Sequence, residues 1–275
     1  MAEFPFGNSL ELINLVLPWY ITYIVFFKEI IIITDTKQLK KLLLISFLLL
    51  STYCFSQKQY EFDYLIEYKL TLFKDSIKIN NRAFRKKDKT IKKYYLTNSK
   101  KNNYAAVITE LDSLKYRMIF KDENGLYSNV ILMKSDLNKA EYINIDCKYV
   151  SKYENSFKYQ TKHYDFFVLK DTIINKEAYR KYKLESIKPK RSKSRKLGTE
   201  YYIIENGTEF HFPILNFSTA YEEWKTKRNL PHGIFFEKYF IDFYGQLDSK
   251  ESLINYRKID KKILIQKECD YTVRK

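Results

Sequence analysis

The residues of this 275-residue chain best suited to metal or acid–base chemistry are its three histidines, His163, His211 and His232. Glu209 and His211 are two positions apart in the predicted strand 208–214, so both side chains project from one face of that strand. Carboxylate oxygens and imidazole nitrogens bind zinc, and His232 in the following turn supplies a third ligand. We therefore take Glu209, His211 and His232 as a candidate metal site. The alternative is that His211 occupies the solvent face of a half-buried strand and His232 a surface turn.

No local catalytic or cofactor motif accompanies these residues. The chain contains no Gly-rich phosphate loop, no Gly-x-Ser-x-Gly, no His-Glu-x-x-His and no Cys-x-x-Cys, and its six glycines leave few places where backbone alone binds phosphate. The sequence therefore predicts no cofactor and no catalytic residue. It favours a binding or structural role over an enzymatic one.

Cys147 and Cys269 are the two cysteines that follow the amino-terminal apolar region. In an oxidising compartment they can pair and close a long loop, which contributes roughly 4 kcal/mol in the chain-entropy view. The alternative is a pair of free buried thiols. Both interpretations stay open, because the sequence does not show whether the two Cα atoms come within bonding reach.

The strongest concentration of charge lies in residues 188–196 (KPKRSKSRK). Its six cations are Lys188, Lys190, Arg191, Lys193, Arg195 and Lys196. The chain has a formal net charge of +16, but only nine of its 49 cations are Arg, the residue favoured for bidentate recognition of phosphate and bases. Its wealth of Lys, Tyr, Phe, Ile and Asn matches AT-rich codon usage. Nucleic acid is therefore not the expected partner. The segment is either a solvated loop or a contact for anionic lipid headgroups or surface polysaccharide.

An uninterrupted apolar run at residues 42–55 (LLLISFLLLSTYCF) indicates export. Its 14 residues are too few for a membrane-spanning helix, which needs about 20, but they suit the core of a secretory signal. Three lysines precede the run, and small residues precede a cut before Gln57. We predict a signal peptide over residues 40–56. Cleavage before a lipidated Cys54 is the alternative, although Tyr53 stands where that cleavage needs a small residue.

Residues 1–39 lie upstream of this signal. Within them, residues 10–34 form a second apolar stretch, interrupted by Pro18 and the pair Lys28-Glu29. This stretch is either a membrane segment or part of a start that is set too early. We favour a true start at Leu39, which leaves a normal signal peptide of two lysines and an apolar run. Residues 57–275 then form a single exported domain, in the periplasm or at the outer surface, with a membrane tether only if the amino-terminal segment is retained.

Alternation with a period of two dominates from Gln57 onward and predicts strands. Between Tyr60 and Leu72 apolar and aromatic residues take every even position and polar residues most odd ones, the pattern of a long strand with one buried face. Residues 114–120 repeat it, and Asn124-Gly125 marks a hairpin turn. Further strands are expected at 126–133, 163–169, 178–187, 199–205, 208–214, 233–244 and 262–273, with weaker ones at 94–96 and 105–110.

Helices are few in this pattern. One is expected at 219–229, where Thr219 and Glu222 have the spacing of a capping box, and a weaker one at 248–256. Successive hairpins without strand–helix alternation predict a mainly β fold. We expect a curved antiparallel sheet or half-barrel with one or two short helices, preceded by an amino-terminal hydrophobic helix or signal segment.

Two features of the chain resemble known proteins. The Lys-Lys-Leu-Leu-Leu signal that ends in Phe-Ser-Gln before an aromatic strand resembles those of exported proteins from AT-rich Gram-negative bacteria. The segments 171–175, 179–182 and 200–204 resemble GLPGLI-type proteins, uncharacterised relatives of the half-barrel lipoprotein-carrier fold, over roughly residues 57–244. The Gly-Leu-Pro-Gly-Leu-Ile stretch itself is absent, and residues 229–234 (NLPHGI) only approximate it.

The sequence and this resemblance together predict an exported, non-enzymatic β-rich protein, periplasmic or surface-associated. The resemblance implies that a concave apolar face holds a lipid-like or hydrophobic ligand. The alternative is a structural or interaction module of the cell envelope, and an enzyme with dispersed catalytic residues comes third. A pocket lined by Tyr and Phe favours the first hypothesis and a filled core with an exposed edge strand the second. A cleft that gathers His211, His232 and carboxylates favours the third.

Overall fold

The computed structural model of the chain describes residues 41, 45–46, 57–74 and 87–272. The chain divides into two units, Met1–Gln57 and Lys58–Lys275. The predicted signal peptide (40–56) and upstream segment (1–39) lie outside the described residues, apart from three helical positions, Lys41, Ile45 and Ser46. Within the described part of the chain, no helix has both the length and the apolar character that a membrane crossing requires.

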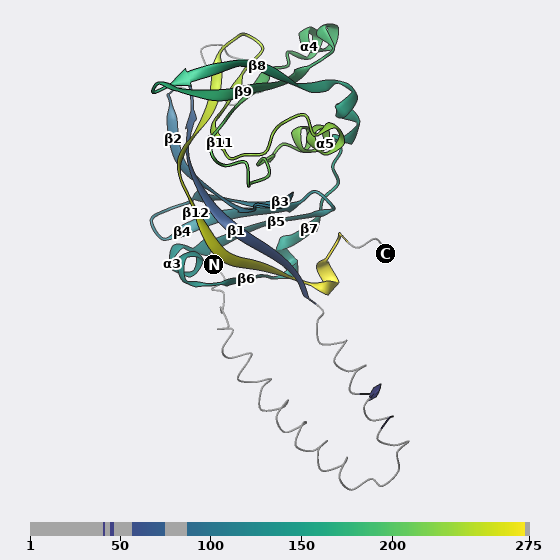
Figure 1. Ribbon diagram of the computed structural model, residues 1–275. Helices are drawn as coiled ribbons and strands as arrows, with labels where there is room; N and C mark the ends of the chain where they lie inside the picture. Colours follow the sequence, from purple (N-terminus) through teal and green to yellow (C-terminus); the bar gives the residue numbers. More distant parts are fainter. Residues whose placement is uncertain (1–40, 42–44, 47–56, 75–86, 273–275) are drawn as a thin grey trace. The chain divides into compact units, whose positions relative to one another are not determined.

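The second unit is built on one sheet of twelve strands, in the order β7-β5-β4-β3-β2-β1-β12-β11-β10-β9-β8, with β6 paired to β12 off this path. The pairings whose register is described are antiparallel, except that β6 runs parallel to β12. The strands are β1 (Gln57–Leu72), β2 (Lys89–Asn98), β3 (Lys101–Glu110), β4 (Lys115–Asp122), β5 (Leu126–Met133), β6 (Tyr142–Ile145), β7 (Val150–Lys152), β8 (Tyr164–Ile174), β9 (Glu177–Ser186), β10 (Thr199–Ile204), β11 (Phe235–Ile241) and β12 (Leu247–Gln266). The sheet is strongly curved (Figure 1), so the predicted mainly β, curved antiparallel fold is confirmed.

Strand β1 contributes to two hydrophobic cores. Its even-numbered aromatic and aliphatic residues from Tyr60 to Tyr68 are all buried, as the alternation predicts. Tyr60 and Phe62 belong to a first core, which also draws on β2–β7, the end of β12 and the helix α3 (Lys134–Lys139). The rest of the buried face, from Tyr64 onward, belongs to a second core together with β2 and β8–β11. The long central strand therefore joins the two halves of the sheet.

The segment 205–234, which we call the plug, lies inside the curve of the sheet, between β8 and β9 on one side and β3 and β5 on the other (Figure 1). A hydrogen bond of 2.8 Å from Glu205 N to Ile234 O closes its two ends. The plug contains the helix α5 (Ser218–Lys227), which confirms the helix predicted near 219–229. Trp224 is 2% exposed and packs in the second core, where its indole nitrogen donates to Leu230 O at 3.1 Å. The plug thus fills the concave side of the sheet with apolar side chains.

Two predicted elements are wrong. Residues 208–214 form turns and a loop in the plug instead of a strand, because Pro213, Ile214 and Leu215 are buried consecutively, and such burial on all sides does not follow a period of two. Residues 248–256 lie in β12 instead of a helix, because their backbone pairs with β11, with Glu251 opposite Lys238.

The capping box predicted at Thr219 and Glu222 is also absent. The helix begins one residue earlier, with Phe217 as its cap and no side-chain cap hydrogen bond.

Candidate functional site

A cavity of about 270 Å³ lies between the concave face of β2–β4 and the loop that leads into α5. Much of its sheet side comes from odd-numbered residues of β3 and from β4, because strand residues two apart share a face. The end of β2 and the even-numbered Asn102 and Tyr104 of β3 contribute as well. Val107 lies directly opposite Ile119 in the β3–β4 pair, and Ala105 lies opposite Lys121. The plug closes the cavity with Phe212, Pro213, Ile214 and Leu215. Most of the surface exposed in the cavity is apolar, with an aromatic contribution from Tyr104 and Phe212, although about half of the lining residues are polar.

Polar groups of β2 and β3 also line this cavity. Lys101 is exposed, and Asn98, Asn102 and Asn103 are half-buried there. Asn102 Nδ2 donates to the carbonyl of Pro213 at 3.2 Å. An apolar interior with a few amide and ammonium groups at its mouth is the usual composition of a site for an amphipathic small molecule.

Backbone carbonyls and amides of the plug are held by the loop between β2 and β3. Lys100 Nζ donates to Phe210 O at 3.1 Å, and Phe212 N donates to Ser99 O at 2.9 Å. Ser99 is in turn fixed by Asp63, whose carboxylate accepts from the Ser99 backbone amide at 2.7 Å. The loop over the cavity is therefore held by hydrogen bonds to the sheet as well as by apolar packing.

A second polar part of the lining is formed by Lys121, Glu123 and Asn216. Lys121 forms an ion pair with Glu123, and its ammonium donates to Asn216 O at 3.0 Å. Ser218, the first residue of α5, lies 3.3 Å from Lys121 Nζ and hydrogen-bonds to Tyr153 OH. Burial raises the pKa of Glu123, and Lys121 opposes that effect. One oxygen of this carboxylate, Oε2, has no hydrogen-bond partner among the described residues. The cluster joins the start of α5 to β4 and to the far wall of the cavity.

A second hollow, of about 690 Å³, lies beyond Glu123 and is mainly polar. Several of its cations already have carboxylate partners: Lys58 is near Asp122 and Asp270, and Lys152 is near Glu154. The apolar cavity is therefore the stronger candidate for a ligand.

The structure places the candidate metal residues in three different environments. His211 is 1% exposed. Its Nδ1 hydrogen-bonds to the carbonyl of Phe212, so Nδ1 is the donor, and Nε2 accepts from Thr97 Oγ1 at 2.8 Å. Burial lowers the pKa of His211. Both ring nitrogens are thus occupied, whereas Glu209 is exposed and paired with Arg180 at 2.9 Å.

His232 lies at the surface, with its ring 4.5 Å from that of Phe212. His163 lies apart from both, beside the start of β8. Across the described residues, no group of three or more His, Cys, Asp or Glu side chains is arranged to hold a metal ion.

A cluster of buried charges lies on the concave face of β2, β10, β11 and β12, and sequence reasoning missed it. Lys93 Nζ is 2.7 Å and Lys238 Nζ 3.5 Å from the carboxylate of Glu251, and Tyr95 OH donates to the same carboxylate at 2.8 Å. Burial alone would raise the pKa of Glu251, but Lys238 and Lys93 lower it to about 2. Lys238 also donates to the plug through Asn216 Oδ1 at 2.9 Å.

Glu200 is the second carboxylate of this cluster, and its pKa is shifted in the other direction. It accepts a hydrogen bond from Tyr202 OH, and no Lys or Arg among the described residues lies within ion-pair distance. Burial raises the pKa of Glu200 to about 6, and Lys238 only partly offsets this effect. One carboxylate of the cluster is thus held ionised, and the other titrates near neutral pH.

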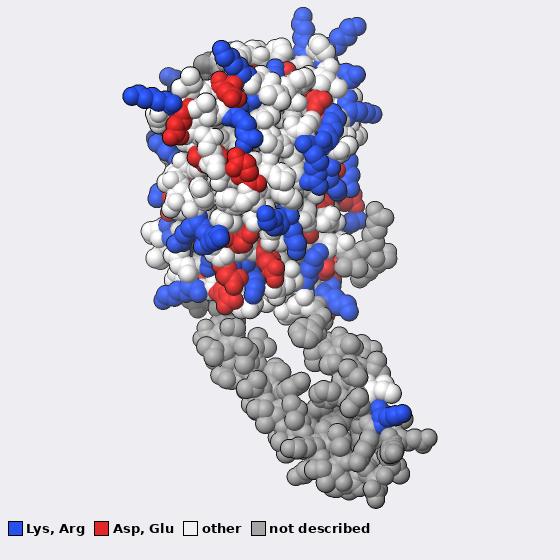
Figure 2. Space-filling view, in the orientation of Figure 1, with Lys and Arg blue, Asp and Glu red and all other residues white. Residues whose placement is uncertain are grey.

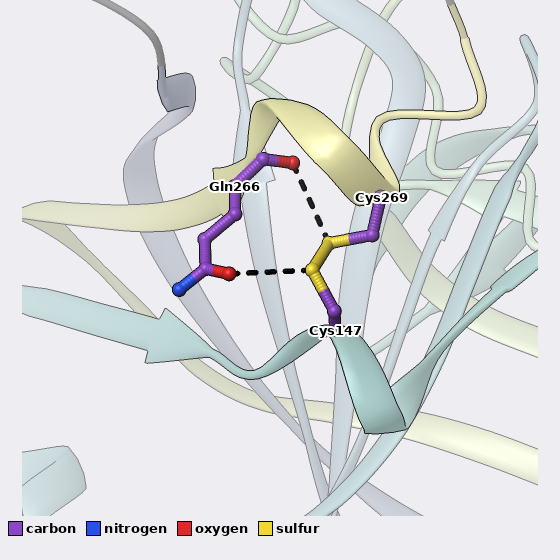
Figure 3. The surroundings of a disulfide bond; sticks show 3 residues. All are labelled: Cys147, Gln266 and Cys269. Carbon is purple, nitrogen blue, oxygen red and sulfur yellow. Dashed lines mark hydrogen bonds between the residues drawn. A yellow bond between two sulfur atoms is a disulfide. The ribbon is translucent and has the colours of Figure 1, made fainter.

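Cys147 and Cys269 form a disulfide bond, with their Cα atoms 5.5 Å apart (Figure 3). The bond joins the 3-10 turns η1 (Cys147–Tyr149) and η3 (Lys267–Cys269), and Cys269 is 3% exposed. Two oxygens of Gln266 lie 3.3 and 3.4 Å from the two sulfur atoms.

The basic segment 188–196 forms a short helix, α4 (Pro189–Arg195), between β9 and β10. It lies at the surface, on the side of the domain away from the first core (Figure 1). None of its six cations contributes to the apolar cavity. The segment is thus separate from the candidate ligand site.

Comparisons with known proteins give no family assignment. No protein-family profile matches the chain, and no curated protein matches it. The resemblance to GLPGLI-type proteins therefore stays a prediction.

A search of solved structures finds similar strand arrangements at very low identity. The MucA/MucB complex of Pseudomonas aeruginosa matches with 4% identity and a TM-score of 0.35, over 71% of this chain and 51% of that chain. A putative outer membrane lipoprotein-sorting protein domain from Vibrio parahaemolyticus matches with 8% identity and a TM-score of 0.28, over 71% and 85% of the two chains. A DUF1329 family protein from Desulfovibrio piger matches with 9% identity, a TM-score of 0.28 and the same coverages. This chain spans about half the length of the MucB chain it matches. Similarities at this level assign no function to the chain.

Proposed function

We propose that this protein binds a small lipid-like ligand, a single acyl chain or a molecule of similar size, in the cavity between β2–β4 and the plug, and that it does so outside the cytoplasm without catalysing a reaction. The observation that supports the proposal is the apolar cavity of about 270 Å³ under the plug. Its volume is near the lower end for small-molecule sites, which begin at about 300 Å³. A single chain fits this size better than a multi-chain lipid.

The chemistry of the lining supports an amphipathic ligand. An acyl chain would contact Val107, Ile119 and Leu215, and its polar end would reach the mouth near Lys101 and Asn102. A ligand carboxylate or phosphate would gain a charge-assisted hydrogen bond from the exposed Lys101 ammonium. We therefore expect anionic single-chain amphiphiles to bind better than neutral ones.

The polar end of the cavity supports binding without catalysis. The Ser218 hydroxyl lies near two potential bases, Glu123 at 3.4 Å and Lys121 at 3.3 Å, but these two side chains are paired with each other. A nucleophile needs a free base to accept its proton. The Ser218 hydroxyl instead joins Tyr153 and Lys121 in fixing the start of α5.

The test is titration of the folded protein with a fluorescent fatty acid. Ala105 is half-buried in the cavity wall, so Ala105→Leu adds three carbon atoms inside it. We expect this variant to weaken binding at least about tenfold. Ala178→Leu, at an exposed position of β9, is the matched control and should bind as the wild type does.

Each outcome of this titration decides a point. Unchanged affinity in the Ala105→Leu protein, with its fold retained by circular dichroism, would move the ligand away from this cavity. A wild-type protein without saturable binding would refute the proposed function.

The alternative function, an interaction module of the cell envelope, is favoured by one observation. Strand β8 ends the sheet, and Val168 and Ile173 on it are 73% and 76% exposed. A long edge strand with exposed apolar residues is a template for pairing with a strand of another protein. If no apolar probe binds in the cavity, this alternative becomes the better proposal.

Export is tested separately, by mass spectrometry of the amino terminus of the protein recovered from its native host. A terminus at Gln57 supports cleavage after the signal peptide. A lipid on Cys54 would attach the protein to a membrane, and an intact chain in the cytosol would refute export.

A further inference from the structure

The helix α4 and the 3-10 helix η2 (Lys158–Lys162) form one basic face of the domain. Arg191 Nη2 donates to Gln160 Oε1 at 2.9 Å, which links α4 to η2. Ile187 N donates to His163 O at 2.8 Å and joins the residues just outside the two elements. We call the result the α4 face. Its cations are Lys158, Lys162, Lys188, Lys190, Arg191, Lys193, Arg195 and Lys196.

The cations of the α4 face lack counter-charges in the part of the chain that the structure describes. Among the described residues, none of the eight has a carboxylate within ion-pair distance, whereas lysines elsewhere in the domain repeatedly do. Figure 2 shows Lys and Arg side chains projecting from the end of the domain that carries α4, where they outnumber the Asp and Glu side chains in view. An uncompensated cluster of this kind creates a positive potential that attracts anionic surfaces.

The pKa of His163 shows that cations from both segments act on the same place. Burial lowers the pKa of His163, and Arg191, Lys162, Lys188 and Arg195 lower it further. Three of these cations come from α4 and its flanks, and one comes from η2.

Exposed apolar side chains flank the same cations. Phe157, which caps η2, is 48% exposed, Tyr159 within η2 is 51% exposed, and Ile187 before α4 is 39% exposed. Aromatic rings of this kind are favoured at the boundary between headgroups and acyl chains, and basic side chains beside them contact anionic headgroups. A solvated loop needs neither feature.

We propose that the α4 face docks the protein on an anionic lipid bilayer. The cations supply the attraction to the headgroups, and Phe157, Tyr159 and Ile187 enter the interfacial layer. A polysaccharide would use the same cations but would gain little from these exposed apolar groups. The proposal depends on neither the apolar cavity nor its ligand, so the two are tested independently.

The test is co-sedimentation of the purified domain with two kinds of vesicle, phosphatidylcholine alone and phosphatidylcholine with about one third phosphatidylglycerol. We expect binding to the anionic vesicles only, and weaker binding as salt rises. The variant Lys190→Gln, Lys193→Gln and Arg195→Gln removes three exposed cations of the α4 face. Each basic residue near an anionic surface contributes about 1 kcal/mol, so the triple variant should lose affinity on the order of 100-fold.

The control is a variant that loses the same number of positive charges outside the α4 face. Lys139→Gln, Lys258→Gln and Lys267→Gln also replace three exposed lysines that form no ion pair with a described residue. This variant should lose less than about threefold in affinity, through net charge alone. Phe157→Ala with Tyr159→Ala should weaken binding and leave its salt dependence unchanged.

Three results would overturn the proposal. One is equal binding to neutral and anionic vesicles, and another is an equal loss in the two triple variants. The third is binding to a sulfated polysaccharide but not to anionic vesicles, which would assign the α4 face to envelope polysaccharide instead.

Discussion

Replacing Glu200 with Gln should stabilise the protein at neutral pH. Glu200 is buried beside Tyr202, and burial raises its pKa from the ordinary value of 4.5 to about 6. A carboxyl whose pKa is raised on folding binds protons more tightly in the folded state, so stability falls as the pH rises from 4.5 through 6. The difference of 1.5 pH units corresponds to about 2 kcal/mol. Above pH 7 the free energy of unfolding is lowered by this full amount.

The Gln side chain removes the charge and keeps the acceptor for Tyr202 OH. The free energy of unfolding of Glu200→Gln, from urea titrations at several pH values, should therefore exceed that of the wild type by about 2 kcal/mol at pH 8. The two proteins should converge near pH 4.5, where the wild-type carboxyl is largely protonated. Glu268→Gln, at an exposed position, is the control and should leave the pH profile unchanged.

The pKa of Glu251 is shifted in the opposite direction, so this residue controls how the stability of the protein changes in acid. Lys238 and Lys93 hold its pKa at about 2 against the effect of burial, so its contribution is present above pH 4.5 and is lost as the pH falls toward 2. The two carboxyls together should contribute most near pH 4.5 to 5. The reasoning is refuted if Glu200→Gln destabilises the protein at pH 8, because Glu200 would then be a stabilising ionised member of the cluster.

Three further predictions concern the disulfide, the plug and the candidate metal residues. Reduction of Cys147–Cys269, which are 122 residues apart, should lower the free energy of unfolding by at most about 5 kcal/mol. Thiol titration of the unreduced, unfolded domain should find neither thiol free. Trp224→Ala should cost about 3–5 kcal/mol in urea unfolding, because it empties a buried site and leaves the carbonyl of Leu230 without its donor. Glu209→Ala should change stability by less than about 0.5 kcal/mol, and added zinc should not shift the melting temperature of either protein; a zinc-dependent shift lost in the variant would restore the metal hypothesis.

The alternation of the sequence was sufficient to predict the sheet where a strand buries one face. In β1 the even residues from Tyr60 to Tyr68 are buried in this way. The same rule failed in residues 208–214, where Phe210 is exposed but His211, Pro213 and Ile214 are buried. A segment enclosed by the sheet on one side and by α5 on the other has no single buried face, and the sequence alone did not show this enclosure.

The cavity escaped prediction because β3 is covered on both faces. Its even residues Tyr104, Ala106 and Ile108 lie in the first core, while Ala105 and Val107 line the cavity. A usable signal was present, since residues 104–108 (YAAVI) are apolar at every position, which is typical of a strand buried on both sides. What no local pattern shows is that the second cover is the plug, which is more than 100 residues away in the chain.

The charges of the chain show why burial and strand register are needed before function can be assigned. Lys93 and Lys238 read in the sequence like the lysines of 188–196, yet they face Glu251 inside the domain and hold its carboxylate. Lys238 lies directly opposite Glu251 only because β11 pairs with β12 in one register. Paired cations of this kind organise the fold and are not available to an external partner. The cations of the α4 face have no described counter-charge and are gathered on one surface, so they are available to act on something outside the molecule.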